Sequence, residues 1–238
     1  KPYRDRKYNL CLIATKAMKV LDALKLLKSS LTDKTDVIIL SNGMGYHEQA
    51  QQICKPARVF AATTTEAAYL ARDGKVHHVA EGKTIIGPLS LDKTPSWLPN
   101  FKDALPNVIW KPNIEAALWR KFAINCVINP LTAIYRCPNG ELLTKPNLNS
   151  LIKDICSEIE LVGNSIGFLT SADPLYDSVL NVIQSTAENF SSMQQDIEHG
   201  RETEIESING YLVDIASQVE IDTPLNKELL NKIRELHK

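Results

Sequence analysis

The chain has 238 residues, of which 44% are hydrophobic, and a formal net charge of −1, which predicts one large or two smaller domains with a hydrophobic core. Its 27 basic residues are spread along the chain among 28 acidic ones, so a nucleic-acid-binding surface, which requires a basic patch, is not expected. No apolar run approaches the roughly 20 residues that span a bilayer, so a membrane partner is not expected either.

The first third of the chain alternates short apolar runs with helical stretches. The apolar runs, typical of buried parallel strands, lie at residues 8–14, 37–40 and 58–64, and the helical stretches lie at 17–27 and 46–54. Parallel sheets bind ligands at the carboxyl ends of their strands, where Lys16, Asn42 and residues 63–65 are found. Gly43 and Gly45 follow Asn42 and allow the backbone to approach a ligand closely.

From residue 69 the pattern changes to short strands and turns, and the strand signals stop after Pro112. Strands are predicted at 75–80, 84–86 and 107–110, with a helix at 98–105, and the first two strands are interpreted as an antiparallel extension of the sheet. Helices are predicted at 114–129, 148–166, 175–199, 203–219 and 227–236. The sequence therefore predicts an α/β domain in residues 1–112 and an all-α domain in residues 113–238.

Lys121, Asn125 and Asn129 form a narrow polar stripe on an otherwise apolar helix. They recur at every fourth residue and drift by only about 40° per step around the helix axis. A helix that is apolar nearly all round is normally buried, so the stripe predicts a site for a polar ligand. Desolvation would lower the pKa of Lys121 and make it a proton donor near neutral pH. The alternative is a lysine whose stem packs on the surface while its ammonium reaches water.

Asn189, Ser192 and Asp196 share one face of the predicted helix at 175–199. This spacing fits a ligand-binding face, but by itself it favours a solvated helix surface.

Thr203 and Glu206 have the spacing of a capping box, in which Thr203 caps a helix and Glu206 bonds back to it. Glu204 would then lie in the first turn, where the helix dipole favours a carboxylate. Glu204 either stabilises the helix start alone or also pairs with Lys121.

The cysteines and histidines do not have the spacing of a metal site. The cysteines are odd in number and widely spaced, which predicts reduced core thiols and a cytoplasmic protein: Cys11, Cys54, Cys126, Cys137 and Cys156. No two of them have the spacing of zinc ligands. His77 and His78 are adjacent on a predicted strand and point to opposite faces, so they cannot share a metal.

Longer motifs occur in order along almost the whole chain. They are Ser41-Asn42-Gly43-Met44-Gly45, Thr63-Thr64-Thr65, Trp119-Arg120-Lys121 continuing to Pro130-Leu131-Thr132-Ala133, Cys137-Pro138-Asn139-Gly140-Glu141-Leu142, Glu188-Asn189-Phe190-Ser191-Ser192-Met193, Thr203-Glu204-Ile205 and Ile208-Asn209-Gly210. In these motifs the chain resembles the ketopantoate reductase (2-dehydropantoate 2-reductase) family. The resemblance implies an incomplete Rossmann-type dinucleotide-binding domain, followed by a helical domain of the 6-phosphogluconate dehydrogenase C-terminal type.

The resemblance also implies reduction of ketopantoate to pantoate with NADPH, in pantothenate (vitamin B5) and coenzyme A biosynthesis, by a monomer or homodimer. Lys121 matches the family's catalytic lysine, which protonates the ketone oxygen as hydride reaches C2. Glu204 matches the acidic residue that holds lysine, substrate and cofactor in register. Positions that match substrate-binding residues are Asn42, Asn125, Asn129, Asn139, Asn189 and Ser192. Positions that approach the NADPH/NADP+ cofactor are Lys16, Asn42, Ala68 and Glu204.

The sequence departs from the family pattern at its start. The family begins with a strand, a Gly-x-Gly-x-x-Gly turn and a helix that hold the pyrophosphate, and the 238 residues contain no such motif. We therefore expect the chain to begin after about the first fifty residues of the family pattern, and NADPH binding by this chain alone to be impaired. The family's preference for NADPH over NADH also depends on a basic residue in the missing segment.

Two alternatives remain open at this point. One is a different 2-oxo acid or hydroxy acid dehydrogenase of the same architecture. The other is a non-catalytic fragment that binds pantoate-like ligands. The second alternative is mildly disfavoured, because a non-catalytic relic has no need to keep all the polar residues of the predicted site. These residues are Lys121, Asn125, Asn129, Ser192 and Glu204.

Overall fold

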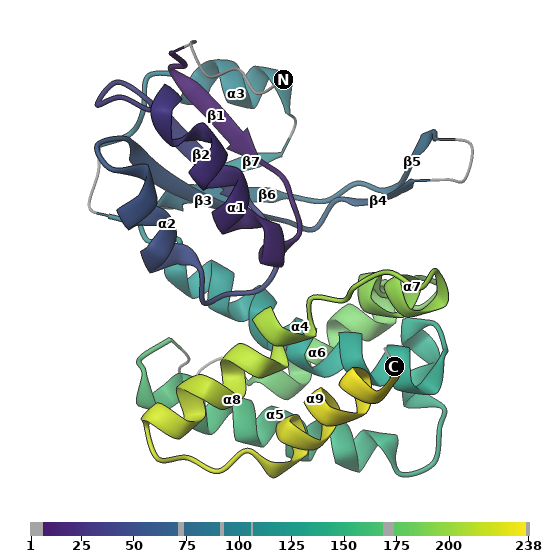
Figure 1. Ribbon diagram of the computed structural model, residues 1–238. Coiled ribbons are helices and arrows are strands. Elements are labelled where there is room, and N and C mark those ends of the chain that lie inside the picture. The colour runs from purple at the N-terminus through teal and green to yellow at the C-terminus, as the bar shows by residue number, and fades with distance from the viewer. Residues whose placement is uncertain (1–6, 71–73, 91–92, 106, 169–173, 237–238) are drawn as a thin grey trace. The chain divides into compact units, whose positions relative to one another are not determined.

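The structure is a computed structural model that describes residues 7–70, 74–90, 93–105, 107–168 and 174–236. The chain divides into two compact units, which are shown in Figure 1. The α/β unit comprises Lys1–Ser41 and Tyr46–Leu118, and the helical unit comprises Asn42–Gly45 and Trp119–Lys238. The predicted combination of an α/β part and an all-α part is confirmed. The resemblance also implies that residues 1–112 bind NADP and that residues 113–238 bind substrate and carry the catalytic residues, and this division stays a prediction.

The α/β unit is built on a five-stranded sheet of order β1-β2-β3-β6-β7. The strands are β1 Leu10–Ile13, β2 Asp36–Leu40, β3 Arg58–Thr64, β6 Thr84–Pro88 and β7 Val108–Trp110. Strands β1, β2 and β3 are mutually parallel, β6 is antiparallel to β3, and β7 is parallel to β6. The helices of this unit are α1 Ala17–Leu27, η1 Lys28–Ser30, α2 His47–Cys54 and α3 Leu98–Ala104.

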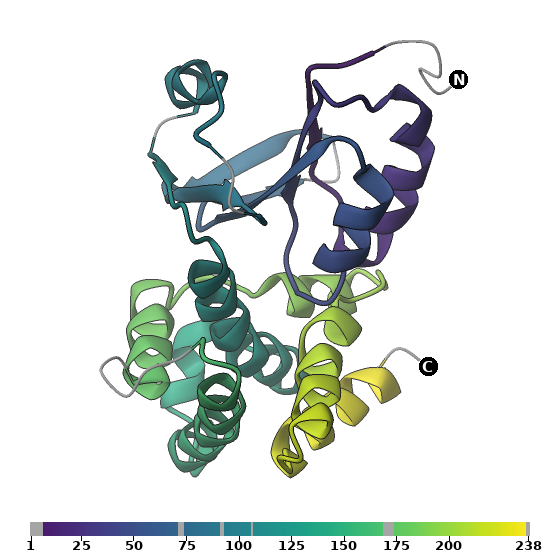
Figure 2. The ribbon, with the colours of Figure 1, turned by 90° about the vertical axis from the view of Figure 1, so that its left-hand side faces the viewer.

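Strand β2, which lies between β1 and β3, is apolar from Val37 to Leu40. Val37 and Ile39 pack into one cluster with α1 and α2, whereas Ile38 packs with Phe60 and α3 in another. Successive side chains of a strand point to opposite faces, so a strand covered on both sides carries apolar residues on both faces. Figure 2 shows α3 on the opposite side of the sheet from α1 and α2.

A second, two-stranded sheet is formed by β4 Ala67–Leu70 and β5 Val76–Ala80. It is a hairpin that extends away from the main sheet, and every residue of β5 is exposed. The prediction that residues 75–80 extend the main sheet is therefore wrong. Both edges of β3 are occupied, by β2 and by β6, so β5 has no place beside it.

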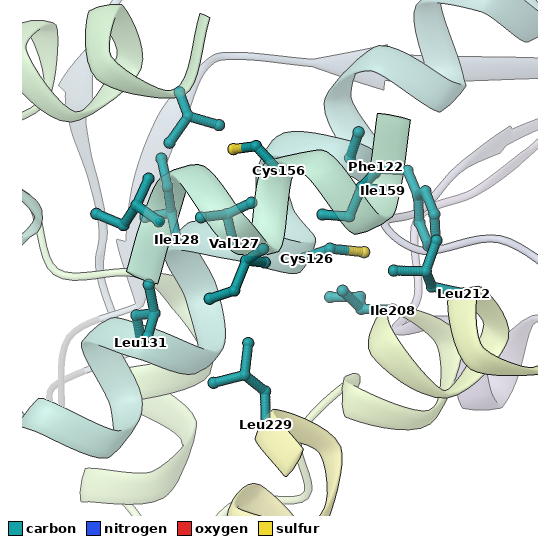
Figure 3. Close-up of a cluster of buried hydrophobic side chains, with 14 of the residues drawn as sticks. Phe122, Cys126, Val127, Ile128, Leu131, Cys156, Ile159, Ile208, Leu212 and Leu229 are labelled. Atoms are coloured by element: carbon teal, nitrogen blue, oxygen red, sulfur yellow. The ribbon is translucent and has the colours of Figure 1, made fainter. Parts of the chain in front are cut away.

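The helical unit is organised around α4 Glu115–Tyr135, which begins in the α/β unit. The remaining elements are η2 Asn139–Leu143, α5 Leu148–Ser165, α6 Leu175–Ser185, α7 Ser192–Glu198, η3 Ile205–Ser207, α8 Asn209–Gln218 and α9 Pro224–Leu236. Figure 3 shows Phe122, Cys126 and Val127 of α4 among side chains of α5, α8 and α9. The expectation that this apolar helix is buried is confirmed.

Four predicted helices differ from the observed ones by more than one residue, and the one predicted at 227–236 begins three residues earlier. The helix expected to end at Asn129 continues through Pro130 to Tyr135. The helix predicted at 175–199 is two helices, because Ser191 has extended backbone angles and its Oγ accepts a hydrogen bond from Gln194 N at 3.1 Å, which starts α7. The helix predicted at 203–219 is the short η3 followed by α8.

The described residues were also searched for membrane-spanning helices and for metal-binding groups. No helix in the described ranges is long and apolar enough to cross a membrane. The described residues also contain no group of three or more His, Cys, Asp or Glu side chains that could hold a metal ion.

Candidate active site

Lys121 and Glu204 are linked through the side chain of Asn42. Lys121 Nζ donates a hydrogen bond to Asn42 Oδ1 at 2.9 Å, and Asn42 Nδ2 donates to Glu204 Oε2 at 3.3 Å. An amide has one acceptor end and one donor end, so it fits between an ammonium and a carboxylate in a single orientation. Three residues that lie far apart in the sequence thus form one polar cluster in the helical unit.

The glycines beside Asn42 allow its loop to pack against the segment before and within α8. A Cβ atom on Gly43, at φ +72°, would lie 2.6 Å from the Ser207 carbonyl oxygen. A Cβ atom on Gly45, at φ +94°, would lie 2.7 Å from Cδ2 of Tyr211. Met44 N also donates to Ser207 O at 2.9 Å. In the structure the close approach that glycine permits is therefore to the protein itself, and it fixes where Asn42 points.

The capping box predicted at Thr203 is wrong. Thr203 Oγ1 is buried and has no hydrogen-bond partner, and the helix that follows is the one-turn η3. Glu206 instead forms a two-fold ion pair with Arg234, with both distances 2.7 Å. Glu204 precedes η3 and is only 8% exposed, so its carboxylate belongs to the Lys121 cluster and makes no capping bond.

The environment of Lys121 lowers the pKa of its ammonium. Burial disfavours the charged ammonium, and the nearby charge of Glu204 opposes this effect only in part, so that the pKa of Lys121 falls to about 8. A lysine with this pKa is protonated at neutral pH and releases its proton far more readily than an ordinary lysine. Desolvation thus lowers the pKa of Lys121, as its position on the apolar helix predicts.

Asn125 and Asn129 extend the cluster along α4, as their spacing predicts. Asn129 is only 7% exposed. Within the described part of the chain, neither side-chain amide forms a hydrogen bond. A polar group buried to this degree normally has a partner, so the Asn129 amide, like that of the half-buried Asn125, has donors and an acceptor available for a ligand.

Asn139 and Asn189 are neighbours in the structure. Asn139 N donates to Asn189 O at 2.9 Å, and Asn139 Nδ2 donates to Thr186 Oγ1 at 2.8 Å. The Asn139 side-chain oxygen is buried without a partner. Asn189 lies in the turn between α6 and α7, so the expectation that it shares a helix face with Ser192 and Asp196 is wrong.

Ser192 begins α7 and is exposed, and its neighbour Ser191 connects α7 to α4. Thr132, on α4, donates to Ser191 Oγ at 2.7 Å. Neither Thr132 nor Ser191 was a predicted site residue. Ser191 could have been found from the sequence, because a serine three positions before Gln194 has the spacing typical of a helix N-cap.

Lys16 and Ala68 lie in the α/β unit, on different elements. Lys16 is the N-cap residue of α1, a helix with no side-chain cap and no acidic residue in its first turn. Ala68 is exposed on the hairpin strand β4. An ammonium beside a helix N-terminus is a donor set that fits an anionic group such as a dinucleotide phosphate. The residues present thus fit part of such a cofactor.

Comparison with known proteins identifies the family. The profile of "Ketopantoate reductase PanE/ApbA" matches residues 2–90, and that of "Ketopantoate reductase PanE/ApbA C terminal" matches residues 113–237. The chain belongs to the ketopantoate reductase family. The 2-dehydropantoate 2-reductase of Escherichia coli O157:H7 is 46% identical to this family member over 229 residues, or 95% of this chain and 73% of the relative. The protein of the same name from Vibrio cholerae serotype O1 is 40% identical over 230 residues, or 96% and 77%.

Solved structures share the fold of this ketopantoate reductase family member. The PanE/ApbA family ketopantoate reductase from Ralstonia eutropha JMP134 has a TM-score of 0.86 at 25% identity, covering 98% of this chain and 76% of that one. D-mandelate dehydrogenase in complex with NADH has a TM-score of 0.88 at 21% identity, covering 97% and 80%, and supports the fold alone. The predicted fold class, Rossmann-type followed by helical, is confirmed.

Proposed function

We propose that this protein is a 2-dehydropantoate 2-reductase, which reduces ketopantoate to pantoate with NADPH in pantothenate and coenzyme A biosynthesis. Membership of the family and the 46% identical relative of that name support the reaction. The single observation that carries the mechanism is the hydrogen-bonded series Lys121, Asn42 and Glu204.

Lys121 acts as the general acid in this proposal. NADPH supplies the hydride that reaches C2 of the ketone. The Lys121 ammonium donates a hydrogen bond to the carbonyl oxygen and transfers its proton as that oxygen becomes an alkoxide. A cation at this position stabilises charge that is greatest in the transition state, which accelerates the reaction instead of merely tightening substrate binding.

Asn42 and Glu204 keep the lysine charged and oriented. Asn42 accepts a hydrogen bond from the ammonium and Glu204 counteracts the loss of its hydration, so the acid remains protonated at neutral pH. The expected substrate contacts are amides and a hydroxyl, which suit the carboxylate and hydroxyl groups of ketopantoate: Asn42, Asn125, Asn129, Asn139, Asn189 and Ser192.

Cofactor binding is assigned to residues 1–112 and substrate binding to residues 113–238. Lys16 and the N-terminus of α1 would hold a phosphate group, and Ala68, Asn42 and Glu204 are further positions expected to approach the cofactor. This part of the proposal is tested by titrating the protein, as its gene encodes it, with NADPH and following the quenching of tryptophan fluorescence. Loss of affinity in Lys16→Ala, with no loss in Lys19→Ala on the same helix, is the expected result.

The reaction is tested with the protein as its gene encodes it. We expect oxidation of NADPH in the presence of ketopantoate to be at least about tenfold more efficient than with a branched 2-oxo acid that lacks the terminal hydroxyl. Equal efficiency would favour a different 2-oxo acid dehydrogenase of the same architecture. Binding of pantoate without any NADPH oxidation would favour a non-catalytic protein.

We also propose a cytoplasmic location and a monomeric or homodimeric state. The five cysteines are free, and all but Cys11 are buried, which suits a reducing compartment. A structural relative from Staphylococcus aureus is described as a dimeric ketopantoate reductase. Sedimentation of the purified protein distinguishes the two oligomeric states.

A further inference from the structure

Pro130 lies inside α4 and removes one helical hydrogen bond. In a regular helix the carbonyl of Cys126 accepts a hydrogen bond from the backbone N–H of residue 130. Proline has no N–H, and its ring also disturbs the preceding turn, so a proline at this position normally kinks or ends a helix. Helix α4 nevertheless continues to Tyr135. The Cys126 carbonyl therefore needs a donor from outside the helix.

Asn209 supplies this donor. Its Nδ2 donates to the Cys126 backbone oxygen at 2.9 Å, and Asn209 is completely buried. Figure 3 shows Cys126 among Phe122, Ile208 and Leu212, an apolar setting in which water is not available as a substitute donor.

The orientation of the Asn209 amide is fixed by a series of buried hydrogen bonds. The Glu158 carboxylate, which is an acceptor, takes a bond from Asn226 Nδ2 at 2.8 Å. The Asn226 oxygen then faces Asn209 and accepts from its Nδ2 at 3.1 Å. Both neighbours of this nitrogen, the Cys126 carbonyl and the Asn226 oxygen, are acceptors, so the amide cannot be reversed without placing oxygen against oxygen.

This bond connects the two segments that carry the reactive groups. Cys126 follows Lys121 by five residues on α4 and immediately follows Asn125, and Asn209 follows Glu204 by five residues. We propose that Asn209 is a positioning residue: by replacing the N–H that Pro130 removes, it holds the Lys121 helix in register with the Glu204 segment. The expected effect of Asn209 on catalysis rests on the proposed function, whereas its bond to the Cys126 carbonyl is independent of that function.

The test is a double-mutant cycle of Asn209→Ala and Pro130→Ala, in the protein as its gene encodes it. In the single variant Asn209→Ala we expect kcat for ketopantoate to fall roughly tenfold while KM changes less than about twofold, because the acid is misplaced. The alkaline limit of kcat should also move to lower pH, because the displaced Glu204 charge then raises the pKa of Lys121 less.

Pro130→Ala restores a backbone N–H for the Cys126 carbonyl. In that background the effect of Asn209→Ala on kcat should shrink to about twofold or less. Equal effects in the two backgrounds, or an unchanged kcat in Asn209→Ala, would overturn the proposal. If Asn209→Ala alone gives no folded protein, recovery of folded protein in the double variant supports it and failure to recover overturns it.

Ile233→Ala is the matched control, because Ile233 is a fully buried residue of the same core on α9. It should lower the melting temperature but leave kcat within about twofold. Should the wild-type protein reduce no ketopantoate, the proposed function fails and the cycle is read from melting temperatures. A smaller loss from Asn209→Ala in the Pro130→Ala background then supports the replacement bond, and an equal loss overturns it.

Discussion

Two buried carboxylates of the helical unit, Glu158 and Glu204, have almost the same exposure and very different surroundings. They are 9% and 8% exposed. Glu158 accepts hydrogen bonds from Leu225 N at 2.9 Å, Asn226 N at 3.0 Å and Asn226 Nδ2 at 2.8 Å. Glu204 accepts from Asn42 Nδ2 at 3.3 Å, and its charge acts on Lys121.

The difference shows that the partners of a buried carboxylate, and not its burial, indicate its role. The donors to Glu158 are the first backbone N–H groups of α9 and an amide, none of which titrates, so Glu158 fixes the start of a helix. The partner that Glu204 influences is a lysine with a pKa of about 8, which titrates in the physiological range. We therefore expect substitution of Glu158 to affect stability and substitution of the Glu204 cluster to affect catalysis.

The largest expected effect is that of Lys121→Ala on turnover. Loss of the proton donor should lower kcat about 10²-fold or more, equivalent to at least about 2.7 kcal/mol, with a smaller change in KM. Steady-state kinetics with ketopantoate and NADPH measures it. Lys232→Ala is the control, because Lys232 is exposed and paired with Glu228. A raised KM with kcat intact would show that Lys121 only binds substrate.

The same substitution at both carboxylates should have different effects on stability. Glu158→Gln replaces an oxygen that accepts N–H bonds by an NH2 group, so the free energy of unfolding should fall by about 2 kcal/mol. Glu204→Gln should change it by less than about 1 kcal/mol, because the hydrogen bond that Glu204 accepts from Asn42 Nδ2 is long, at 3.3 Å. Urea denaturation of the two variants measures both values. Equal losses would remove the distinction between a structural and a catalytic carboxylate.

A further prediction concerns the pH dependence of the reduction. Protonated Lys121 is the acid, so kcat should fall as pH rises through about 8. Glu204→Gln removes a charge that raises the lysine pKa and should move this limit down by about one unit, whereas Asn42→Asp adds a carboxylate and should move it up by about one unit. The pH profiles of kcat measure both shifts. Shifts in the same direction would show that another group sets the limit.

Local patterns predicted much of the fold because they reflect local physics. The apolar run of β3 and the periodicity of α1 gave the observed bounds, Arg58–Thr64 and Ala17–Leu27. The break between α6 and α7 was missed because an N-cap serine inside a periodic stretch does not disturb the hydrophobic period. The place of residues 75–80 was missed because sheet order depends on which edges remain open, which is not a local property.

The candidate site was predictable in its parts but not in its connections. Helical spacing identifies Lys121, Asn125 and Asn129, because all three lie on one element. The link from Lys121 through Asn42 to Glu204 joins three segments distant in sequence, and no spacing reveals it. The functions assigned to these residues stay predictions.

The smallest expected effect is that of the Lys121 charge on stability. Removing this charge should raise the free energy of unfolding, whereas neutralising Glu158 should lower it. Folding lowers the pKa of Lys121 from 10.5 to about 8, so at neutral pH the folded state holds an unfavourable charge. Lys121→Met keeps the shape and removes the charge, and it should raise the free energy of unfolding by about 1 kcal/mol at pH 7. The unfolded wild type binds more protons than the folded protein between about pH 8 and 10.5, so wild-type stability rises in that window and the advantage of the variant should shrink. Urea denaturation at pH 7 and pH 10 measures the difference in free energy of unfolding between the variant and the wild type. A variant less stable than the wild type at pH 7 would show that the Lys121 ammonium stabilises the fold, as the Glu158 carboxylate does.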